Sequence, residues 1–319
     1  MSRAHRRWPD AAGMAAGFAL DALFGDPRRW HPVAGFGTAA NALERRLYAP
    51  TRAAGAVHTT IAVGLPVAVA AAAVLATRRR PPLRTALVAL GTWSVLGGRT
   101  LRREGENMAA ALDAGDQPAA RQRLPHLCGR DPSTLDGTEL ARATVESVAE
   151  NTSDAVVAPL FWGALAGLPG LLGYRAVNTL DAMVGHRSPR YERFGTPAAR
   201  LDDVANFVPA RLTARLTILA APLVGGDRHR ALRIWRRDRA EHPSPNAGQC
   251  ESAMAGALGV RLGGRNVYSG RTEIRPFLGD GRRPEPADIR RATRLSSVVG
   301  AAALVLAVAG TLTRRRRSG

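Results

Sequence analysis

The sequence predicts an all-α, polytopic integral membrane protein whose helical, polar loop regions carry the chemically distinctive motifs. The 319 residues are 45% hydrophobic, and the apolar residues gather in blocks at 53–77, 83–98, 155–174, 204–224 and 297–313. A helix needs about 20 mostly apolar residues to cross a bilayer, and a buried helix of a soluble protein rarely runs so long without a polar face. We find no alternating strand pattern of useful length and no internal repeat. We therefore expect one membrane-embedded domain over residues 1–319.

The charge of the chain is strongly basic and is carried by arginine alone. The formal net charge is +19, and the sequence contains no lysine. Chemistry that needs a lysine amine, such as a Walker-A loop or a Schiff base, is therefore excluded. Nucleic-acid binding is not expected, because no recognition motif accompanies the charge. Arginine does suit phosphate and carboxylate ligands, which its planar fork binds through two hydrogen bonds.

Arginine-rich edges border the apolar blocks at 77–84, at 97–103 and at the C-terminus. Such edges favour the cytoplasmic side of a membrane. They cannot all lie there if every block is a simple crossing, because 77–84 separates two adjacent blocks. Charge alone therefore leaves the topology open.

The first polar stretch, "DALFGDPRRWHPVAGFG" at 21–37, contains two turn signals. Gly25-Asp26-Pro27 is typical of a turn, and the proline after His31 fixes an extended corner. This stretch is either a structured connector or part of a functional site.

A helix is expected to begin at Asp136, because Glu139 follows three residues later in a capping-box arrangement. Farther along this helix Glu146, Glu150 and Asp154 recur every fourth residue and share one face. The ridge they form can be solvated and partly paired with Arg142. A bound magnesium ion is the alternative that we favour, because like charges at this spacing destabilise a helix and Asp154 stands where the apolar block begins.

The apolar block that follows is expected to bend or re-enter rather than cross as a rod. An unbroken helix from Asp154 to Asn178 would separate these residues by about 36 Å at 1.5 Å per residue. Pro159, Pro169 and several glycines interrupt it. Interrupted segments of this kind often line binding sites in membrane proteins.

Three further polar motifs follow in the chain. Asn178 and Asp181 lie three residues apart, on one face of a helix that Gly185-His186 ends. The acids at 202 and 203 stand beside two arginines, so they form either mutual ion pairs or a magnesium–phosphate site. The third motif, "HPSPNAGQCE" at 242–251, is a rigid polar loop whose Asn246 can cap the next helix.

Five of these stretches together resemble the CobD/CbiB family of cobalamin biosynthesis. They read "GDPRRWHPV", "ESVAENTSDAVVAPLFW", "NTLDAMVGH", "ERFGTPAARLDDVANFVPARLT" and "HPSPNAGQCESAMAGALGVRLGG". The resemblance runs from about residue 20 to residue 313 in the family's order. Ala182 departs from it, standing where a serine is expected.

The resemblance implies an amide-forming ligase, an adenosylcobinamide(-phosphate) synthase. It would join (R)-1-aminopropan-2-ol, or its O-phosphate, to the free carboxylate of adenosylcobyric acid, with ATP and Mg2+ required. We expect a multi-pass protein of the cell membrane, with its active site at the cytoplasmic face. Its expected partners are the lipid bilayer and other membrane enzymes of nucleotide-loop assembly.

Residue roles are assigned to the family motifs as hypotheses. The metal ligands would be Glu146, Glu150, Asp154, Asp202 and Asp203. Substrate or phosphate would be bound by Arg200, Arg211, Asn178, Asn246 and Asp26. The catalytic residues would be His242 or His31 as the base, together with Asp181.

Two other classes of function are open at this stage. A transporter for a corrinoid or another anion would place its polar groups in the middle of helices and often has an inverted repeat. A non-catalytic scaffold for a corrinoid-assembly complex is the other alternative.

Overall fold

The computed structural model describes residues 8–26, 31–186, 188–268 and 271–313, and most of them are helical. Contacts group the chain into two compact units. The first unit comprises Met1–Gly97, Ala158–Asn206 and Ala303–Gly319, and the second comprises Gly98–Val157 and Phe207–Ala302. The chain passes from one unit to the other four times, so this grouping leaves the expectation of one domain a prediction.

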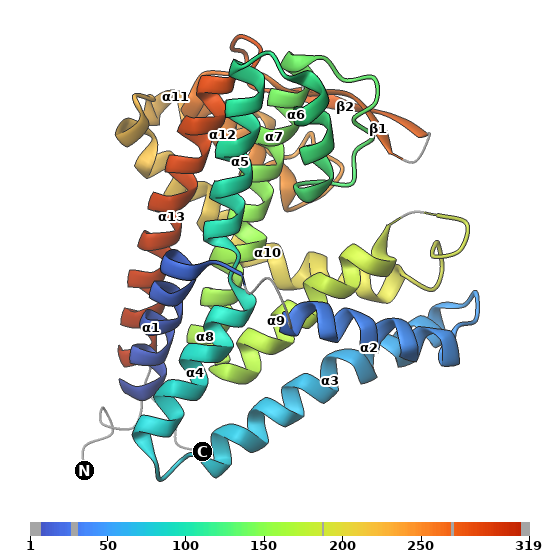
Figure 1. The fold of residues 1–319 in the computed structure, drawn as a ribbon, viewed down its shortest axis with the longest axis vertical. Helices are drawn as coiled ribbons and strands as arrows, with labels where there is room; N and C mark the ends of the chain where they lie inside the picture. Colours follow the sequence, from blue (N-terminus) through green and yellow to red (C-terminus); the bar gives the residue numbers. More distant parts are fainter. Residues whose placement is uncertain (1–7, 27–30, 187, 269–270, 314–319) are drawn as a thin grey trace. The chain divides into compact units, whose positions relative to one another are not determined.

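The regular elements among the described residues of the first unit are all helices (Figure 1). Asp10 and Arg84 join its first and fourth helices through two hydrogen bonds of 2.6 Å. A side chain at Gly13 or Gly17 would collide with the fourth helix, so these glycines allow the close approach of the pair. The helices are α1 (Trp8–Phe24), α2 (Pro32–Leu47), α3 (Arg52–Ala76), α4 (Pro81–Val95), α8 (Ala158–Ala166), α9 (Leu168–Leu180), the start of α10 (Thr196–Ala220) and the end of α13 (Pro286–Thr313).

The expected interruption of the 155–174 block is confirmed. A π-helical turn, Ser153–Val157, precedes α8, and Gly167 separates α8 from α9 with a φ of 66° and a ψ of −150°. This backbone region is essentially restricted to glycine. A side chain at Gly170 would collide with the Trp162 carbonyl, so α9 packs back closely on α8. The block therefore forms a broken helix pair and not one straight rod.

The second unit surrounds an apolar core that includes Met108, Leu140, Val148, Met254 and Leu295. Its regular elements are α5 (Gly98–Asp113), α6 (Gln117–Arg123), a 3-10 turn (Leu124–His126), α7 (Gly137–Thr152), the rest of α10 with a 3-10 turn (Ala221–Val224), α11 (Arg228–Asp238), α12 (Ala247–Leu258), β1 (Leu262–Tyr268), β2 (Arg271–Leu278) and the start of α13.

Two helix starts test the capping predictions. Asp136 caps α7 as expected, and its Oδ1 accepts a hydrogen bond of 2.7 Å from the Glu139 N–H. Asn246 occupies the N-cap position of α12 but makes no side-chain cap. Ser244 takes that role instead, because its Oγ accepts from the Ala247 N–H at 3.2 Å. The expectation that the Asn246 side chain caps this helix is therefore wrong.

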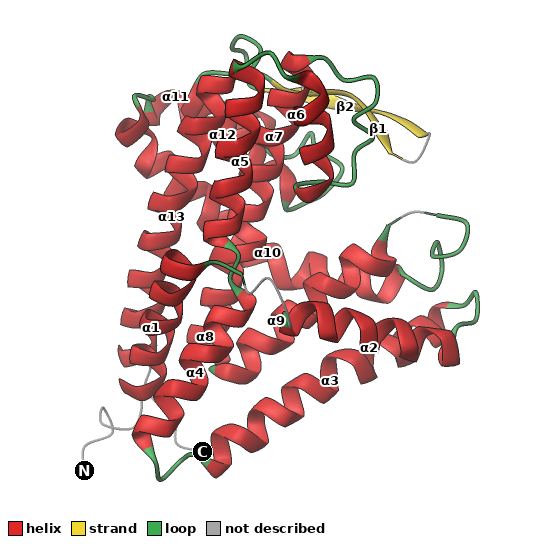
Figure 2. Cartoon of the chain, viewed as in Figure 1, coloured by secondary structure: helices red, strands yellow, loops and turns green. Residues whose placement is uncertain are grey.

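The purely helical class is wrong at one place, because β1 and β2 form an antiparallel hairpin (Figure 2). The register is irregular between Leu262 and Gly264. Gly263, with a φ of 87°, fits this irregularity because a side chain there would collide with the Pro276 carbonyl. The hairpin brings Gly263 and Arg275 to the site described below.

Three helices among the described residues are long and apolar enough to cross a membrane: Arg52–Ala76, Thr196–Val224 and Pro286–Thr313. They correspond to the predicted blocks 53–77, 204–224 and 297–313. The blocks 83–98 and 155–174 do not form such helices. Along α3, Val57, Ile61, Leu65 and Val69 recur every fourth residue and are all exposed.

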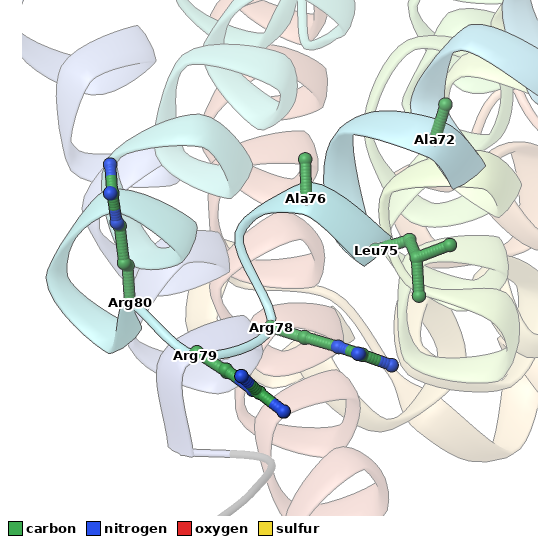
Figure 3. Close-up of a pocket in the computed structure, with 6 residues that line it drawn as sticks. All are labelled: Ala72, Leu75, Ala76, Arg78, Arg79 and Arg80. Atoms are coloured by element: carbon green, nitrogen blue, oxygen red, sulfur yellow. The ribbon is translucent and has the colours of Figure 1, made fainter.

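The end of α3 is basic. Beyond Ala76, a turn carries the exposed residues Arg78, Arg79 and Arg80, next to the exposed Leu75 (Figure 3). Arg78 and Arg79 extend to the same side of the turn, and Arg80 extends to the other. An apolar helix that ends in arginines is typical of a membrane span reaching the headgroup region.

Candidate active site

A polar cavity of about 280 Å3 lies within the second unit. Helix α7 contributes Glu146 and Glu150 to its lining, which the four-residue spacing places on one face. Other charged parts of the lining come from the loop before α7, from α12 and from β2. These charged residues are Arg130, Glu146, Glu150, Glu251 and Arg275.

Glu146 is buried at the centre of an arginine network. Its Oε2 accepts from Arg130 Nη2 at 2.6 Å. Its Oε1 accepts from Arg142 Nη1 at 2.9 Å and from the Gly263 N–H at 2.7 Å. Burial raises the pKa of this carboxyl, but the two guanidinium groups and the N–H outweigh burial and lower the pKa below its ordinary value. Glu146 is therefore an ionised carboxylate, and the pairing with Arg142 considered from the sequence is present.

Glu150 instead lies near two residues that are distant from it in the sequence. His242 and Glu251 each offer a ligand atom, and these atoms and one from Glu150 lie within 4.8 Å of one another. Glu251 is 1% exposed. Burial, Glu150 and Glu146 together raise the pKa of Glu251 well above its ordinary value. The crowded carboxylates therefore favour a shared proton or a cation between them.

His242 places its Nε2 beside this cluster. Its Nε2 lies 3.2 Å from Arg275 Nη1 and 3.6 Å from Glu251 Oε1. The Ser244 N–H donates to Nδ1 at 3.0 Å, and the Ser244 carbonyl lies 3.4 Å from the same nitrogen. A guanidinium only donates, so its contact with Nε2 requires the proton on Nδ1, whereas the Ser244 N–H requires it on Nε2. Burial and the charge of Arg275 lower the pKa of His242. The imidazole is therefore neutral near pH 7 and able to bind a proton or a metal ion.

A second group of predicted residues comes together in the first unit. Asp202 Oδ2 accepts from Asn206 Nδ2 at 3.0 Å, and Asp202 Oδ1 lies 3.5 Å from Asn178 Nδ2. Tyr174 donates to Asn206 at 2.8 Å and so orients its amide. Burial and the neighbouring Asp203 raise the pKa of Asp181 to about 6. The motifs at 178–181 and 202–206 therefore form one acidic cluster, as a shared site requires.

The other predicted residues have separate local surroundings. His31 caps α2, where its Nδ1 accepts from the Val33 N–H at 3.1 Å, and its Nε2 lies 3.7 Å from Asp26; residues 27–30 of this motif lie outside the described residues. Arg211 covers the Phe207 ring with its guanidinium 3.5 Å from the ring centroid. Arg200 is exposed on α10, and Asp154 is half-buried in the π-helical turn. The roles assigned to these residues from the sequence stay predictions.

Sequence reasoning missed three residues of the cavity: Arg130, Glu251 and Arg275. Glu251 stands in a recognised motif, and as a lone acid among small helical residues it could have been singled out. Arg130 and Arg275 carry no local signal, because their place depends on contacts with Glu146 and His242, which are distant in the sequence.

Comparison with known proteins places these motifs in a family. The family model described as CobD/Cbib protein matches residues 14–296. The chain belongs to the CobD/CbiB family. This CobD/CbiB chain is 55% identical over 307 residues to the cobalamin biosynthesis protein CobD of Mycobacterium tuberculosis, a match that covers 96% of this chain and 97% of the relative.

More distant CobD relatives match over similar lengths. The cobalamin biosynthesis protein CobD of Geobacter metallireducens is 45% identical over 300 residues, covering 92% of this chain and 94% of that protein. That of Citrobacter koseri is 42% identical over 299 residues, with 91% and 94% covered. No solved structure has a significant match to this CobD/CbiB chain. Membership makes the chain a protein of cobalamin biosynthesis.

Proposed function

We propose that the protein forms the amide between adenosylcobyric acid and (R)-1-aminopropan-2-ol or its O-phosphate. The observation that carries this proposal is the family match over residues 14–296, which includes every motif discussed above. The reaction would consume ATP and require Mg2+. Its products would be adenosylcobinamide or its phosphate, ADP and inorganic phosphate.

The chemistry of the cavity supports an amide-forming reaction. A carboxylate is a poor electrophile, so amide formation in water needs prior activation, most simply as an acyl phosphate. Phosphoryl transfer depends mainly on positioning and on charge stabilisation. Because the chain contains no lysine, the donors must be arginine, asparagine, histidine or backbone N–H groups. Arg130 and Arg275 line the cavity and supply such positive charge next to buried carboxylates.

We assign three roles within the second unit. Arg130 and Arg275 would bind an anionic group of the substrates through their planar forks. Glu146 would hold Arg130 and Arg142 in place. Glu150 would act at the mouth of the cavity, because it is the least buried of the three glutamates there. The acidic cluster of the first unit would orient or bind a substrate group, as proposed for Asn178 and Asp181.

The three apolar helices support a location in the cell membrane, crossing it more than once. The arginine-rich turn after α3 supports a cytoplasmic position for that end of the helix. Association with other membrane enzymes of nucleotide-loop assembly belongs to the same proposal.

Purified protein in detergent tests the activity directly. It is incubated with adenosylcobyric acid, MgATP and either aminopropanol or aminopropanol phosphate, and the amide product is measured by liquid chromatography and mass spectrometry. We expect product with one of the two amines, and at least a hundredfold less with Glu150→Gln. The matched control is Glu106→Gln, an exposed glutamate of α5, which should retain wild-type activity.

Two results would replace this proposal with another function. Uptake of corrinoid by proteoliposomes in the absence of any amide product would establish a transporter. Product formation only when other enzymes of the pathway are added, unaffected by Glu150→Gln, would leave a scaffold.

A further inference from the structure

Glu150, His242 and Glu251 converge from three separate parts of the second unit. Glu150 lies on α7, Glu251 lies on α12, and His242 lies in the loop before α12. One ligand atom from each lies within 4.8 Å of the other two. Two carboxylate oxygens and an imidazole nitrogen form a donor set that suits a divalent metal ion.

A second observation indicates that this cluster binds something. Glu251 is 1% exposed, and its Oε1 accepts no hydrogen bond from any residue that the structure describes. Leaving a buried acceptor unsatisfied costs about 1–3 kcal/mol, and more when the group is charged. His242 Nε2 lies 3.6 Å from this oxygen, beyond hydrogen-bond distance. A cation held between Glu251, Glu150 and His242 would satisfy this buried oxygen.

We propose that Glu150, His242 and Glu251 bind one divalent metal ion at the wall of the cavity. Three protein ligands leave coordination positions open, as in catalytic metal sites. Glu150 and Glu251 line the cavity, so the open positions would face the space where a substrate carboxylate or phosphate fits.

Arg275 is the group that opposes metal binding. Its Nη1 donates to the same His242 nitrogen at 3.2 Å. A bound ion would take over that lone pair, so the guanidinium would turn toward the cavity and become available to an anionic substrate. The role of the ion in catalysis rests on the proposed function, whereas binding of the ion does not.

Metal binding by the full-length protein in detergent tests this inference. Mn2+ binding is followed by the loss of the free-ion electron paramagnetic resonance signal, and Zn2+ binding by competition with a chromophoric chelator. We expect one ion per chain for at least one of the two metals. Affinity should fall by at least about tenfold in both Glu251→Gln and Glu150→Gln, since loss of an outer-shell partner alone already costs 10- to 100-fold.

The control variant is Glu106→Gln, whose glutamate side chain is 54% exposed and lies 3.6 Å from Arg102. It should bind the metal as the wild type does. If Glu251→Gln fails to fold, Glu150→Gln carries the test, because Glu150 is only partly buried.

The inference is overturned if neither metal binds to the wild type, or if the two cluster variants bind as tightly as the wild type. The carboxylates would then share a proton. Amide formation by a protein that binds no metal at this cluster would overturn the inference and leave the proposed function standing. If the wild type binds the metal, both variants lose that binding, and the wild type makes no amide product, the inference is supported and the proposed function is contradicted.

Discussion

Glu146 illustrates how the second unit can tolerate ionised groups in its interior. Its side chain and that of Arg130 are 4% and 3% exposed, and Arg142 is 6% exposed. Arginine stays protonated at any pH a cell experiences, so these two charges cannot be removed by deprotonation when they are buried. The carboxylate of Glu146 is therefore required between them, with Glu139 as a second partner of Arg142. The Gly263 N–H completes the hydrogen bonds of Glu146.

The substitution Glu146→Gln should strongly destabilise the protein. Removing one partner of a buried ion pair leaves an uncompensated charge and costs about 3–5 kcal/mol. The measurement is the midpoint of thermal unfolding in detergent, followed by circular dichroism.

The matched control for this measurement is Asp113→Asn. Asp113 pairs with Arg290 at 2.6 Å, but the two side chains are 47% and 46% exposed. An exposed pair contributes less than about 1 kcal/mol. Equal unfolding midpoints for the two variants would show that the buried network is not needed for stability.

At the residue scale, the sequence predicted which glutamates share a face of α7 but not which residues contact them. The spacing of Glu146 and Glu150 was enough to place both on one side of a helix. It did not distinguish a carboxylate held by arginines from one that faces a histidine and a second glutamate. That difference depends on Arg130 and Glu251, whose contacts with α7 form only when the tertiary structure does.

Among the elements, the α8–α9 pair depends on a single backbone position. Gly167 adopts a φ of 66° and a ψ of −150°, and a side chain there would meet no atom closer than 3.9 Å. A substitution would therefore be opposed by backbone strain and not by collision.

Gly167→Ala should lower the unfolding midpoint, at a cost of about 1–3 kcal/mol for holding an alanine in this region. The control is Gly64→Ala in the middle of α3, where the added methyl group meets nothing within 4 Å. There alanine should leave stability unchanged or raise it by up to about 1 kcal/mol, because glycine is the poorer helix former. If both variants unfold alike, α8 and α9 do not depend on the glycine conformation.

Sequence patterns predicted this break better than they predicted the hairpin. Pro159, Pro169 and the glycines act locally, so they indicate an interruption without any knowledge of the fold. In the sequence, Ser269-Gly270 is a turn signal between strand-favouring residues, but arginines and two glycines at 263–264 weaken the strand pattern. Glycine suits position 263 because a side chain there would collide with the Pro276 carbonyl and because its N–H contacts Glu146. These contacts are not local in the sequence.

At the scale of the whole molecule, α3 has the clearest membrane signature. Only 17% of its most apolar window is buried within the protein, and four exposed apolar residues follow one face. In water such a face would favour aggregation, whereas in a bilayer it is solvated by lipid. The arginines at 78–80 would then lie among anionic headgroups, where each contributes about 1 kcal/mol.

The protein expressed in bacteria should remain in the membrane pellet after an alkaline carbonate wash and be released only by detergent. Replacing Leu65 and Val69 together by arginine should reduce the amount of protein in that pellet, because each arginine at the centre of a span costs about 2.5–3.5 kcal/mol. Immunoblots of the pellet and the supernatant measure both effects.

The control for this experiment is Ile274→Arg. Ile274 is 83% exposed on β2, outside the three apolar helices, so its replacement should not change the pellet fraction. Wild-type protein found in the carbonate supernatant would show that these helices do not span the bilayer.

The hydrogen bond from the Gly263 N–H to Glu146 has a consequence for how the protein is made. The two residues are 117 positions apart, so a ribosome that has just released α7 has yet to translate the hairpin. Until the hairpin emerges, Arg130, Arg142 and Glu146 must stay hydrated or be shielded by a chaperone. The cavity is therefore completed late in translation, and nascent chains stalled before residue 263 should contain these residues in a protease-accessible form.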